Sequence, residues 1–223
     1  MVEIGPGRWA HPSGALWLPA SQTAVVADPH FGYGWAQRRR GELGPLRDDL
    51  APAKLLALLD ELSPARLVLL GDIVHAPSPA PQEHALVSGI LARLSARAEL
   101  VMVRGNHDRS FDADFGATLQ AKWQAPGLVA VHGDRFPNRT SRHIVAGHWH
   151  PAWKIQDAAG VRHRVPAFAA GQGLTILPAF SPFAAGLDLS GQIPPEWKKS
   201  SGGRFRIYAA TGRRIVFVGE KAS

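Results

Sequence analysis

Short apolar runs alternate with helical patterns through the first half of the chain. Thr23 to Ala27, Arg66 to Leu70 and Leu100 to Val103 are rich in β-branched and aliphatic residues, which predicts buried strands. Between them, Pro52 to Leu62 and Gln82 to Arg97 carry leucine and isoleucine at helical spacing. Strands and helices that alternate in this way predict a parallel sheet with right-handed crossovers.

The second half of the chain is richer in strands and poorer in helical patterns. Ser190 to Gly203, rich in Pro, Gly, Ser and Lys, predicts a loop. A βαβ half that leads into a β-rich half predicts two packed sheets with helices outside, in a single domain over residues 1–223. Further short strands are predicted at Ala15 to Leu18, Leu128 to Val131, Ile144 to Ala146, Arg164 to Ala167, Leu174 to Leu177, Phe205 to Ala209 and Ile215 to Val218.

Several of the predicted strands end in side chains that can bind a metal ion. Because the carboxyl ends of the strands in an α/β sheet form a shared crevice, these side chains predict one site. Asp-x-His and His-x-His are pairs two residues apart, and in an extended segment both side chains of such a pair face the same way. The candidate ligands are Asp28, His30, Asp72, Asn106, His132, His148 and His150.

The chemistry of this ligand set favours two transition-metal ions. Two carboxylates, one amide and four imidazoles suit Mn, Fe or Zn better than Ca or Mg. Seven ligands are too many for one tetrahedral ion and suit two ions that share a carboxylate, for which Asp72 is the predicted bridge. Two ions about 3.5–4 Å apart form the clamp that is used for in-line phosphoryl displacement.

Composition and charge limit the classes of binding partner and the cellular compartment that we expect for this protein. The formal net charge of +7 favours an anionic partner, such as nucleic acid or a phosphorylated substrate, although excess charge can also serve solubility alone. The sequence has no cysteine, which excludes disulfides and thiolate metal sites. No signal peptide is evident and the apolar runs are too short to span a bilayer, so we expect a soluble, cytoplasmic protein without a membrane partner.

Taken in chain order, the motifs resemble those of the calcineurin-like metallophosphoesterases. They are Asp28-x-His30, Gly71-Asp72-x-x-His75, Gly105-Asn106-His107-Asp108, His132 and Gly147-His148-x-His150. The resemblance implies a four-layer α/β/β/α sandwich and a binuclear metal centre with a metal-bridging hydroxide as the nucleophile. His107, oriented by Asp108, would stabilise the transition state or protonate the leaving oxygen. One ion would be held by Asp28, His30, Asp72 and His150, and the other by Asp72, Asn106, His132 and His148.

Other segments resemble the bacterial DNA ligase-associated, DNA-damage-response phosphoesterases. The likeness covers Gly14 to Gly186 and implies a manganese-dependent phosphodiesterase with DNA endonuclease activity in DNA repair. Repair proteins, a DNA ligase or a helicase, are candidate partners on the same ground. Two residues depart from the pattern: Pro29 replaces an apolar residue, and Tyr33 stands where a lysine is expected, which puts one phosphate contact in doubt. The matching segments are Gly14 to Ala20, Asp28 to Gly32, Arg38 to Gly41 and Leu177 to Phe183.

Four residues near the motifs are candidates for substrate binding: Arg38, Arg39, Arg40 and His75. Three consecutive arginines cannot all face one way on a helix, so at least one is expected to be solvated. His75 either helps to place DNA or supports the metal ligands from behind. Trp149 is expected to pack into the second sheet rather than to stack on a base. Structural roles are expected for His11, His84, His143 and His163.

Three functions remain open at this point. The first is a phosphodiesterase that acts on DNA ends or flaps, with DNA or another phosphodiester as substrate. The second is a phosphomonoesterase or small-nucleotide phosphodiesterase with the same metal centre. The third is a non-catalytic DNA-binding module that keeps its metals for stability; the intact Asn106-His107-Asp108 run argues against it, because a purely structural site has no need of His107.

Overall fold

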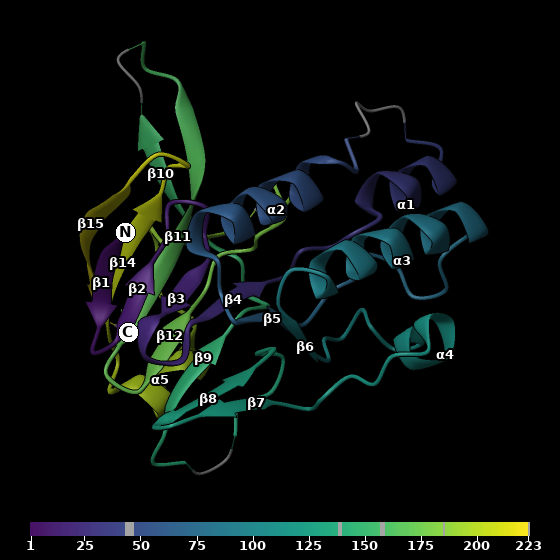
Figure 1. Cartoon of the computed structure of the whole chain (residues 1–223). Coiled ribbons are helices and arrows are strands. Elements are labelled where there is room, and N and C mark those ends of the chain that lie inside the picture. The colour runs from purple at the N-terminus through teal and green to yellow at the C-terminus, as the bar shows by residue number, and fades with distance from the viewer. Residues whose placement is uncertain (43–46, 138–139, 157–158, 185, 223) are drawn as a thin grey trace.

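The computed structural model describes residues 1–42, 47–137, 140–156, 159–184 and 186–222, and its backbone forms two packed sheets with helices outside them (Figure 1). The first sheet has the strand order β1-β2-β3-β4-β5-β6. Its last three strands are parallel, with Val25, Val68 and Val101 side by side in register. The predicted parallel sheet is confirmed. Its strands are β1 (Val2–Gly5), β2 (Arg8–Ala10), β3 (Leu16–Leu18), β4 (Thr23–Ala27), β5 (Arg66–Leu70) and β6 (Glu99–Val103).

The second sheet contains the remaining strands of the described chain. Its main order is β13-β10-β11-β12-β9-β8-β7, and β14 pairs with both β11 and β15. The strands β8, β9 and β12 are parallel to one another, so β8 and β9 end at the same edge. The bounds are β7 (Trp123–Ala125), β8 (Leu128–Val131), β9 (His143–Ala146), β10 (Pro151–Gln156), β11 (Arg162–Gly171), β12 (Leu174–Ile176), β13 (Leu187–Asp188), β14 (Arg204–Ala210) and β15 (Ile215–Ala222).

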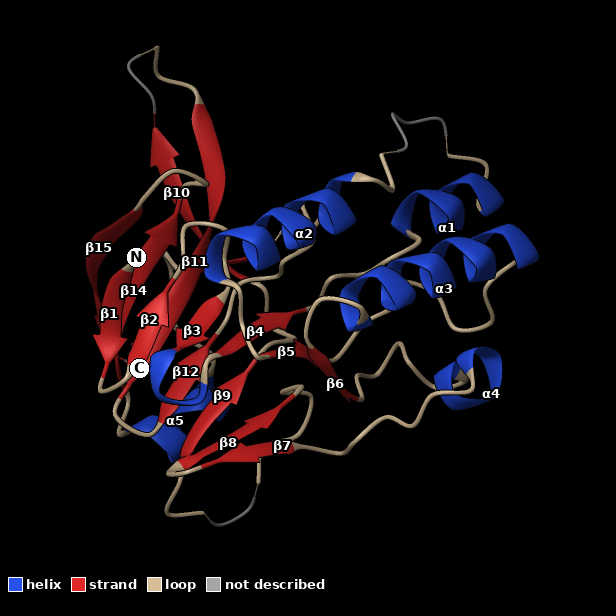
Figure 2. Cartoon of the chain, in the orientation of Figure 1, coloured by secondary structure: helices blue, strands red, loops and turns tan. Residues whose placement is uncertain are grey.

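Helices cover the outer face of each sheet, which completes the four layers (Figure 2). The helices α1 (Tyr33–Arg39), α2 (Leu50–Leu62), α3 (Pro81–Ser95) and α4 (Phe111–Phe115) lie on the side of the first sheet, and α5 (Pro195–Ser201) lies on the second. Three buried clusters fill the spaces between the layers: one under α2 and α3, one between the sheets, and one under α5. The expected α/β/β/α sandwich is therefore confirmed.

Local signals explain where the long helices begin and end. Pro81 occupies the first turn of α3, and the Glu83 carboxylate accepts a hydrogen bond from the Ala80 N–H at 3.3 Å. The last turn of α2 is followed by Ser63 in a left-handed conformation (φ 42°), and Pro64 prevents the helix from continuing. Both helices begin one or two residues before the predicted bounds, which is the ordinary uncertainty at helix ends.

The predicted loop from Ser190 to Gly203 is wrong in one part, because it contains α5. This helix is too short for its periodicity to show in the sequence. It is held by Trp197, which is fully buried and packs edge-on against Trp149 and Phe205 with ring centroids 5.9 and 5.3 Å away. Tertiary burial of one large aromatic side chain stabilises a segment that its polar composition would leave irregular.

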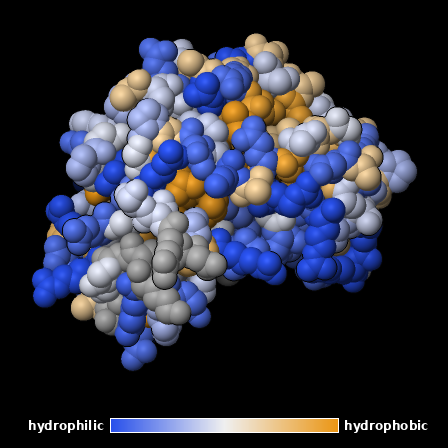
Figure 3. Space-filling view, turned by 90° about the horizontal axis from the view of Figure 1, so that it is seen from below, coloured by the Kyte–Doolittle hydropathy of each residue, from blue (hydrophilic) through white to orange (hydrophobic). Residues whose placement is uncertain are grey.

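Hydrophilic side chains dominate the face shown in Figure 3, with hydrophobic side chains gathered in two areas between them. Among the described residues, none of the helices is both long and apolar enough to cross a membrane.

Candidate metal centre

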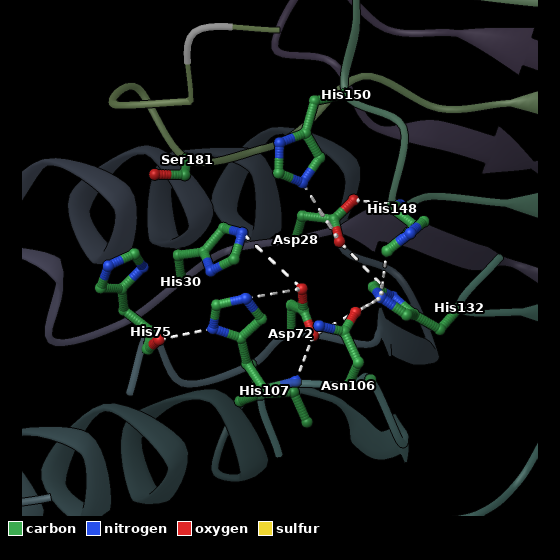
Figure 4. A network of polar contacts seen from close by, with 12 residues as sticks. Asp28, His30, Asp72, His75, Asn106, His107, His132, His148, His150 and Ser181 are labelled. Atoms are coloured by element: carbon green, nitrogen blue, oxygen red, sulfur yellow. Dashed lines mark hydrogen bonds and ion pairs between the residues drawn. The ribbon is translucent and has the colours of Figure 1, made fainter. Parts of the chain in front are cut away.

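The predicted ligands come together at the edge where the central strands of both sheets end (Figure 4). Asp28 and His30 follow β4, Asp72 follows β5, and Asn106 lies three residues after β6. From the second sheet, His132 follows β8, and the turn between β9 and β10 supplies His148 and His150. All seven side chains therefore face one another, although Asp28 and His150 are more than one hundred residues apart in sequence.

The backbone at these ligands is left-handed rather than extended. Positive φ angles occur at Asp28 (53°), His30 (48°), Asp72 (45°), His148 (67°) and His150 (46°). The argument that Asp-x-His and His-x-His share a direction because they are extended is wrong, since the chain turns sharply at each residue. Non-glycine residues in this region cost about 1–3 kcal/mol each and concentrate at functional sites. Fixed cross-loop hydrogen bonds hold the turns, such as His30 N–H to the Asp72 carbonyl at 3.0 Å.

Four ligand atoms surround one point next to His132. Its Nε2 lies 3.0 Å from Asn106 Oδ1, 3.1 Å from His148 Nδ1 and 3.5 Å from Asp72 Oδ1. Donor atoms bound at about 2.1 Å to one ion stand roughly 3.0–3.4 Å apart for octahedral or tetrahedral angles. The spacing observed around His132 Nε2 thus fits one coordination sphere, formed by the set that the resemblance implied.

A second group lies on the other side of Asp72. His150 Nε2 is 3.5 Å from Asp28 Oδ1, and His30 Nε2 is 4.0 Å from Asp72 Oδ2. Ligand atoms of Asp28, His30 and His150 all lie within 4.8 Å of one another. The two oxygens of Asp72 face different groups, Oδ1 toward His132 and Oδ2 toward His30, which is the geometry that a bridging carboxylate requires.

The polar atoms of the second group fit a bound cation. Asp28 is fully buried, and within the described part of the chain its Oδ1 and the Nε2 of His150 have no hydrogen-bond partner. The other Asp28 oxygen accepts a hydrogen bond from the His148 N–H at 2.8 Å. A buried carboxylate oxygen and a buried imidazole nitrogen without partners are costly unless something satisfies them. A divalent ion bound between them would satisfy both the carboxylate oxygen and the imidazole nitrogen.

Burial and neighbouring charges set two of these ligands, His30 and Asp28, in the protonation states that metal binding needs. Burial lowers the pKa of His30 to about 3, so its imidazole is neutral and can ligate at neutral pH. Burial works to raise the pKa of Asp28, but the close contact and charge of His150, with the charge of His132, outweigh it and hold the pKa below its usual range. His30 and Asp28 therefore need to release no proton when a metal ion binds at neutral pH.

His107 lies at the open side of the centre, held by its backbone and its ring. The His107 N–H donates to Asp72 Oδ1 at 2.9 Å, and ring Nδ1 lies 2.6 Å from the His75 carbonyl oxygen. A carbonyl oxygen can only accept, so Nδ1 carries a proton and Nε2 is left to face the centre, 3.9 Å from Asp72 Oδ2. The ring is 36 % exposed, so a substrate can reach it.

The expectation that Asp108 orients the His107 ring is corrected by this arrangement. The Asp108 carboxylate is buried and accepts backbone N–H groups from Ile73 at 2.9 Å, Val74 at 3.1 Å and Gly105 at 2.8 Å. It therefore joins the loop of Asp72 to the loop of Asn106, and the ring is oriented by the His75 carbonyl instead. Adjacency in sequence does not bring the two side chains together because the turn directs Asp108 inward.

Comparison with known proteins agrees with this geometry. Residues 22–160 match the family model for calcineurin-like phosphoesterases. The chain belongs to this family. The solved structure of the Pseudomonas putida nuclease MPE superposes with a TM-score of 0.67 at 26 % identity, covering 95 % of this chain and 94 % of that one. The phosphoesterase Yfce from E. coli shows a TM-score of 0.45 at 16 % identity, over 90 % of this chain and 98 % of that one. A comparison with curated protein sequences finds no match.

Family membership identifies the chain as a metal-dependent hydrolase of phosphoric esters. The family resemblance found in the motifs is confirmed, and the reading as a non-catalytic DNA-binding module is excluded. The similarity to a nuclease agrees with the DNA-damage-response subfamily that the other segments indicated.

The arginine cluster of this phosphoesterase has partners within the protein. Arg38 lies 3.1 Å from Asp48 and over the ring of Trp35, and Arg39 lies 3.2 Å from the fully buried Glu83. Arg40 is exposed at the end of α1. Two of the three arginines thus tie α1 to its surroundings, and substrate contact stays a prediction for the cluster.

His75 and Trp149 occupy the two flanks of the centre. The His75 ring packs between Tyr33 and His107, with centroids 4.6 and 5.7 Å away, and its carbonyl orients His107. This geometry supports a role for His75 in orienting His107. Contact of His75 with DNA stays a prediction. Trp149 packs against the second sheet and α5 as expected, and its indole N–H donates to the Gly133 carbonyl at 3.2 Å.

Sequence reasoning missed a cavity beside His150. It has a volume of about 790 Å³, and its lining includes Lys54, Arg164, Ser181 and Phe183. The segment from Leu177 to Phe183, which resembles the DNA-damage-response phosphoesterases, supplies one wall. No local pattern could have shown the cavity, because its walls come from α2, β11 and the loop after β12. A larger cavity of about 1040 Å³ is lined by Arg8, Arg142 and His143, at the amino end of β9 and away from the ligands.

Proposed function

We propose that this phosphoesterase is a manganese-dependent phosphodiesterase and DNA endonuclease that acts on DNA ends or flaps in repair. The observation that carries the proposal is the paired ligand set with His107 Nε2 beside its bridging residue, Asp72. Similarity to a nuclease over 95 % of the chain supports DNA as the substrate. The net charge of +7 supports an anionic polymer as well.

Each metal position has its own ligand set in the proposal. Bound there, two divalent ions supply Lewis-acid charge to the phosphodiester and lower the pKa of a water molecule into the neutral range. Oxygen and nitrogen donors of this mixture suit manganese as well as iron and zinc, and the subfamily likeness favours manganese. One position is formed by Asp28, His30, Asp72 and His150, and the other by Asp72, Asn106, His132 and His148.

His107 assists the departure of the leaving oxygen. Its Nδ1 proton is fixed by the His75 carbonyl, so Nε2 alone exchanges protons with the substrate side. In the imidazolium form Nε2–H donates to a phosphoryl oxygen or to the leaving alkoxide, and general acid assistance of this kind contributes about 10²–10⁴-fold. Because the His107 ring is partly exposed, it can take up a proton from solvent after it has given one to the leaving oxygen.

The cavity beside His150 favours a diester over a monoester. A diester keeps a second organic substituent on the phosphate after the leaving group departs, and that substituent needs room next to the metal centre. The cavity of about 790 Å³ opens directly at His150 and provides that room. A monoester has no such substituent, so the phosphomonoesterase alternative leaves the cavity unexplained.

Digestion of closed circles tests the endonuclease proposal. Circular single-stranded DNA and relaxed closed duplex DNA are incubated with the protein after EDTA treatment, with and without added manganese. Only with manganese do we expect the single-stranded circle to become linear and the duplex circle to become nicked. His107→Ala should bind manganese as the wild type does and lose about 10²–10⁴-fold in rate, whereas His163→Ala, at an exposed residue of β11, should cut normally. Activity that survives complete metal removal would overturn the mechanism.

A pair of chromogenic substrates tests the diester preference. Hydrolysis of bis(p-nitrophenyl) phosphate is compared with that of p-nitrophenyl phosphate at equal manganese concentration. We expect the higher kcat/KM for the diester. A clear preference for the monoester would replace the proposal with the phosphomonoesterase alternative.

A further inference from the structure

An aromatic stack stands at the rim of the metal centre. The rings of Tyr33 and Phe183 are nearly parallel, with centroids 4.9 Å apart and an interplanar angle of 11°. Tyr33 is itself fixed, because its hydroxyl accepts a hydrogen bond from Gln37 Nε2 at 2.8 Å and its ring packs against His75. Tyr33 therefore forms a firm backing for one face of Phe183. Tyr33 stands where a lysine is expected from the family resemblance, and an aromatic ring at this position provides the backing for Phe183.

The loop that carries Phe183 is tied to the strand end that carries Asp28. Phe180 N–H donates to the Ala27 carbonyl at 2.7 Å, and Ser181 N–H donates to the Asp28 carbonyl at 3.1 Å. The Ser181 hydroxyl in turn accepts a hydrogen bond from the Phe183 N–H at 3.3 Å. Ser181 and His150 line the same cavity. The Phe183 ring is thus held at a set place relative to the metal ligands.

Phe183 also lines the cavity that begins at His150. Tyr33 covers one face of the ring, so the cavity meets the part of the ring that Tyr33 leaves uncovered. Two cationic side chains share the lining: Lys54, whose Nζ donates to the Phe180 carbonyl at 3.1 Å, and Arg164, which donates to the Gly186 carbonyl at 3.3 Å. An aromatic surface next to cations is the composition of sites that hold a base and its sugar-phosphate backbone.

The position of the cavity decides which part of a substrate it would hold. His107 and His150 lie on opposite sides of the Asp28 and Asp72 pair (Figure 4). His107 serves the leaving oxygen in the proposed reaction, so the substituent on the side of His150 is the one that stays on the phosphate. The cavity is therefore placed for the retained nucleoside.

We propose that the cavity beside His150 is a nucleoside subsite in which a base of the substrate stacks on Phe183, extending the pair that Tyr33 and Phe183 form. The inference rests on the proposed phosphodiesterase function and specifies its substrate. An unpaired base can reach such a surface without disruption of a duplex, so the subsite favours single-stranded DNA and flaps over intact duplex.

Matched diesters that differ only in the base test the subsite. The first is thymidine with a p-nitrophenyl phosphate ester, made in both the 5′ and the 3′ form. The second replaces thymine with hydrogen, which leaves a 1,2-dideoxyribose ester. The leaving group is the same in all of them, so the ratio of kcat/KM between thymidine and dideoxyribose esters measures the base alone. Stacking of one base gives an expected ratio of about 5- to 150-fold for at least one of the two forms.

Variants of Phe183 show whether the ratio comes from this ring. Phe183→Ala and Phe183→Leu should bring the ratio to within about twofold of one, whereas Phe183→Tyr should keep it. Phe217→Ala removes an exposed phenylalanine of β15 outside the cavity and should leave the ratio unchanged. A general disturbance of the centre would slow both esters equally and would not move the ratio.

Two results would overturn the inference, and they are distinguishable from failure of the proposed function. A wild-type ratio near one, or a high ratio that Phe183→Ala and Phe183→Leu both leave intact, rejects the subsite while the enzyme still hydrolyses diesters. If manganese-loaded protein hydrolyses neither the thymidine nor the dideoxyribose esters, the phosphodiesterase function fails and the subsite falls with it.

Discussion

Replacement of Gly105 by alanine should break the metal centre without touching a ligand. A Cβ atom built on Gly105 would stand 2.1 Å from the Asp72 backbone nitrogen and 2.3 Å from Asp72 Oδ1. Ordinary contact begins at 3.4 Å, so the loops of Asp72 and Asn106 must separate by about 1.3 Å. The obstacle is backbone, which cannot swing aside. Overpacking of this kind costs about 1–3 kcal/mol or more, and ligands must stay within about 0.5 Å of their productive geometry.

The assay compares Gly105→Ala with Gly89→Ala, a substitution in the middle of α3 where an added Cβ meets nothing within 4 Å. Urea denaturation in EDTA should show lower stability for Gly105→Ala and a gain of about 0.4–1 kcal/mol for Gly89→Ala. Manganese titration should show weaker binding at both positions in Gly105→Ala, since Asp72 bridges them, and kcat should fall by about 10²-fold. Wild-type manganese affinity and turnover in Gly105→Ala would refute the reasoning.

Three further predictions concern the rest of the fold. Trp197→Ala should cost about 3–5 kcal/mol in urea denaturation because the residue is fully buried under the second sheet, and a loss below 1 kcal/mol would show that α5 contributes little. Burial, with the charge of Arg8, lowers the pKa of His143 to about 4, so the folded state excludes a proton that the unfolded chain takes up. The free energy of unfolding should therefore fall as the pH drops from 6.5 toward 4. His143→Gln should lose less of this free energy over the same pH range than the wild type, as measured by urea denaturation. Removal of metal should lower the thermal midpoint, because binding at 100 times Kd stabilises a protein by about 2.7 kcal/mol, and equal midpoints in EDTA and in manganese would contradict the ligand assignment.

Much of the metal centre was predictable because its signals are local. Each central strand is an apolar run that ends in a turn, and the ligand stands within a few residues of that end. Alternation with helical patterns predicts parallel strands, so the strand ends converge whatever the details of packing. The seven candidate ligands that the structure brings together could thus be named before any coordinates, and Asp72 as their bridge stays a prediction. The ligand pairs lie in left-handed turns and not in extended segments, but convergence of the strand ends is enough to bring the side chains together.

The remaining features depend on contacts between segments distant in sequence. The His107 ring takes its orientation from the carbonyl of His75, thirty-two residues earlier, while the adjacent Asp108 turns inward to bind two loops. The short helix α5 exists because Trp197 finds a pocket between Trp149 and Phe205.

By itself, then, the sequence determined the alternation of strands and helices, the two-sheet class of the fold and the candidate metal ligands, because periodicity and strand-end residues are properties of short segments. Only the tertiary structure decided the left-handed turns that aim the ligands, the proton held on His107 Nδ1, and the pairing of Tyr33 with Phe183 beside the cavity. The physical reason is that burial and hydrogen-bond partners belong to pairs of segments, and a pattern along one segment cannot specify its neighbour.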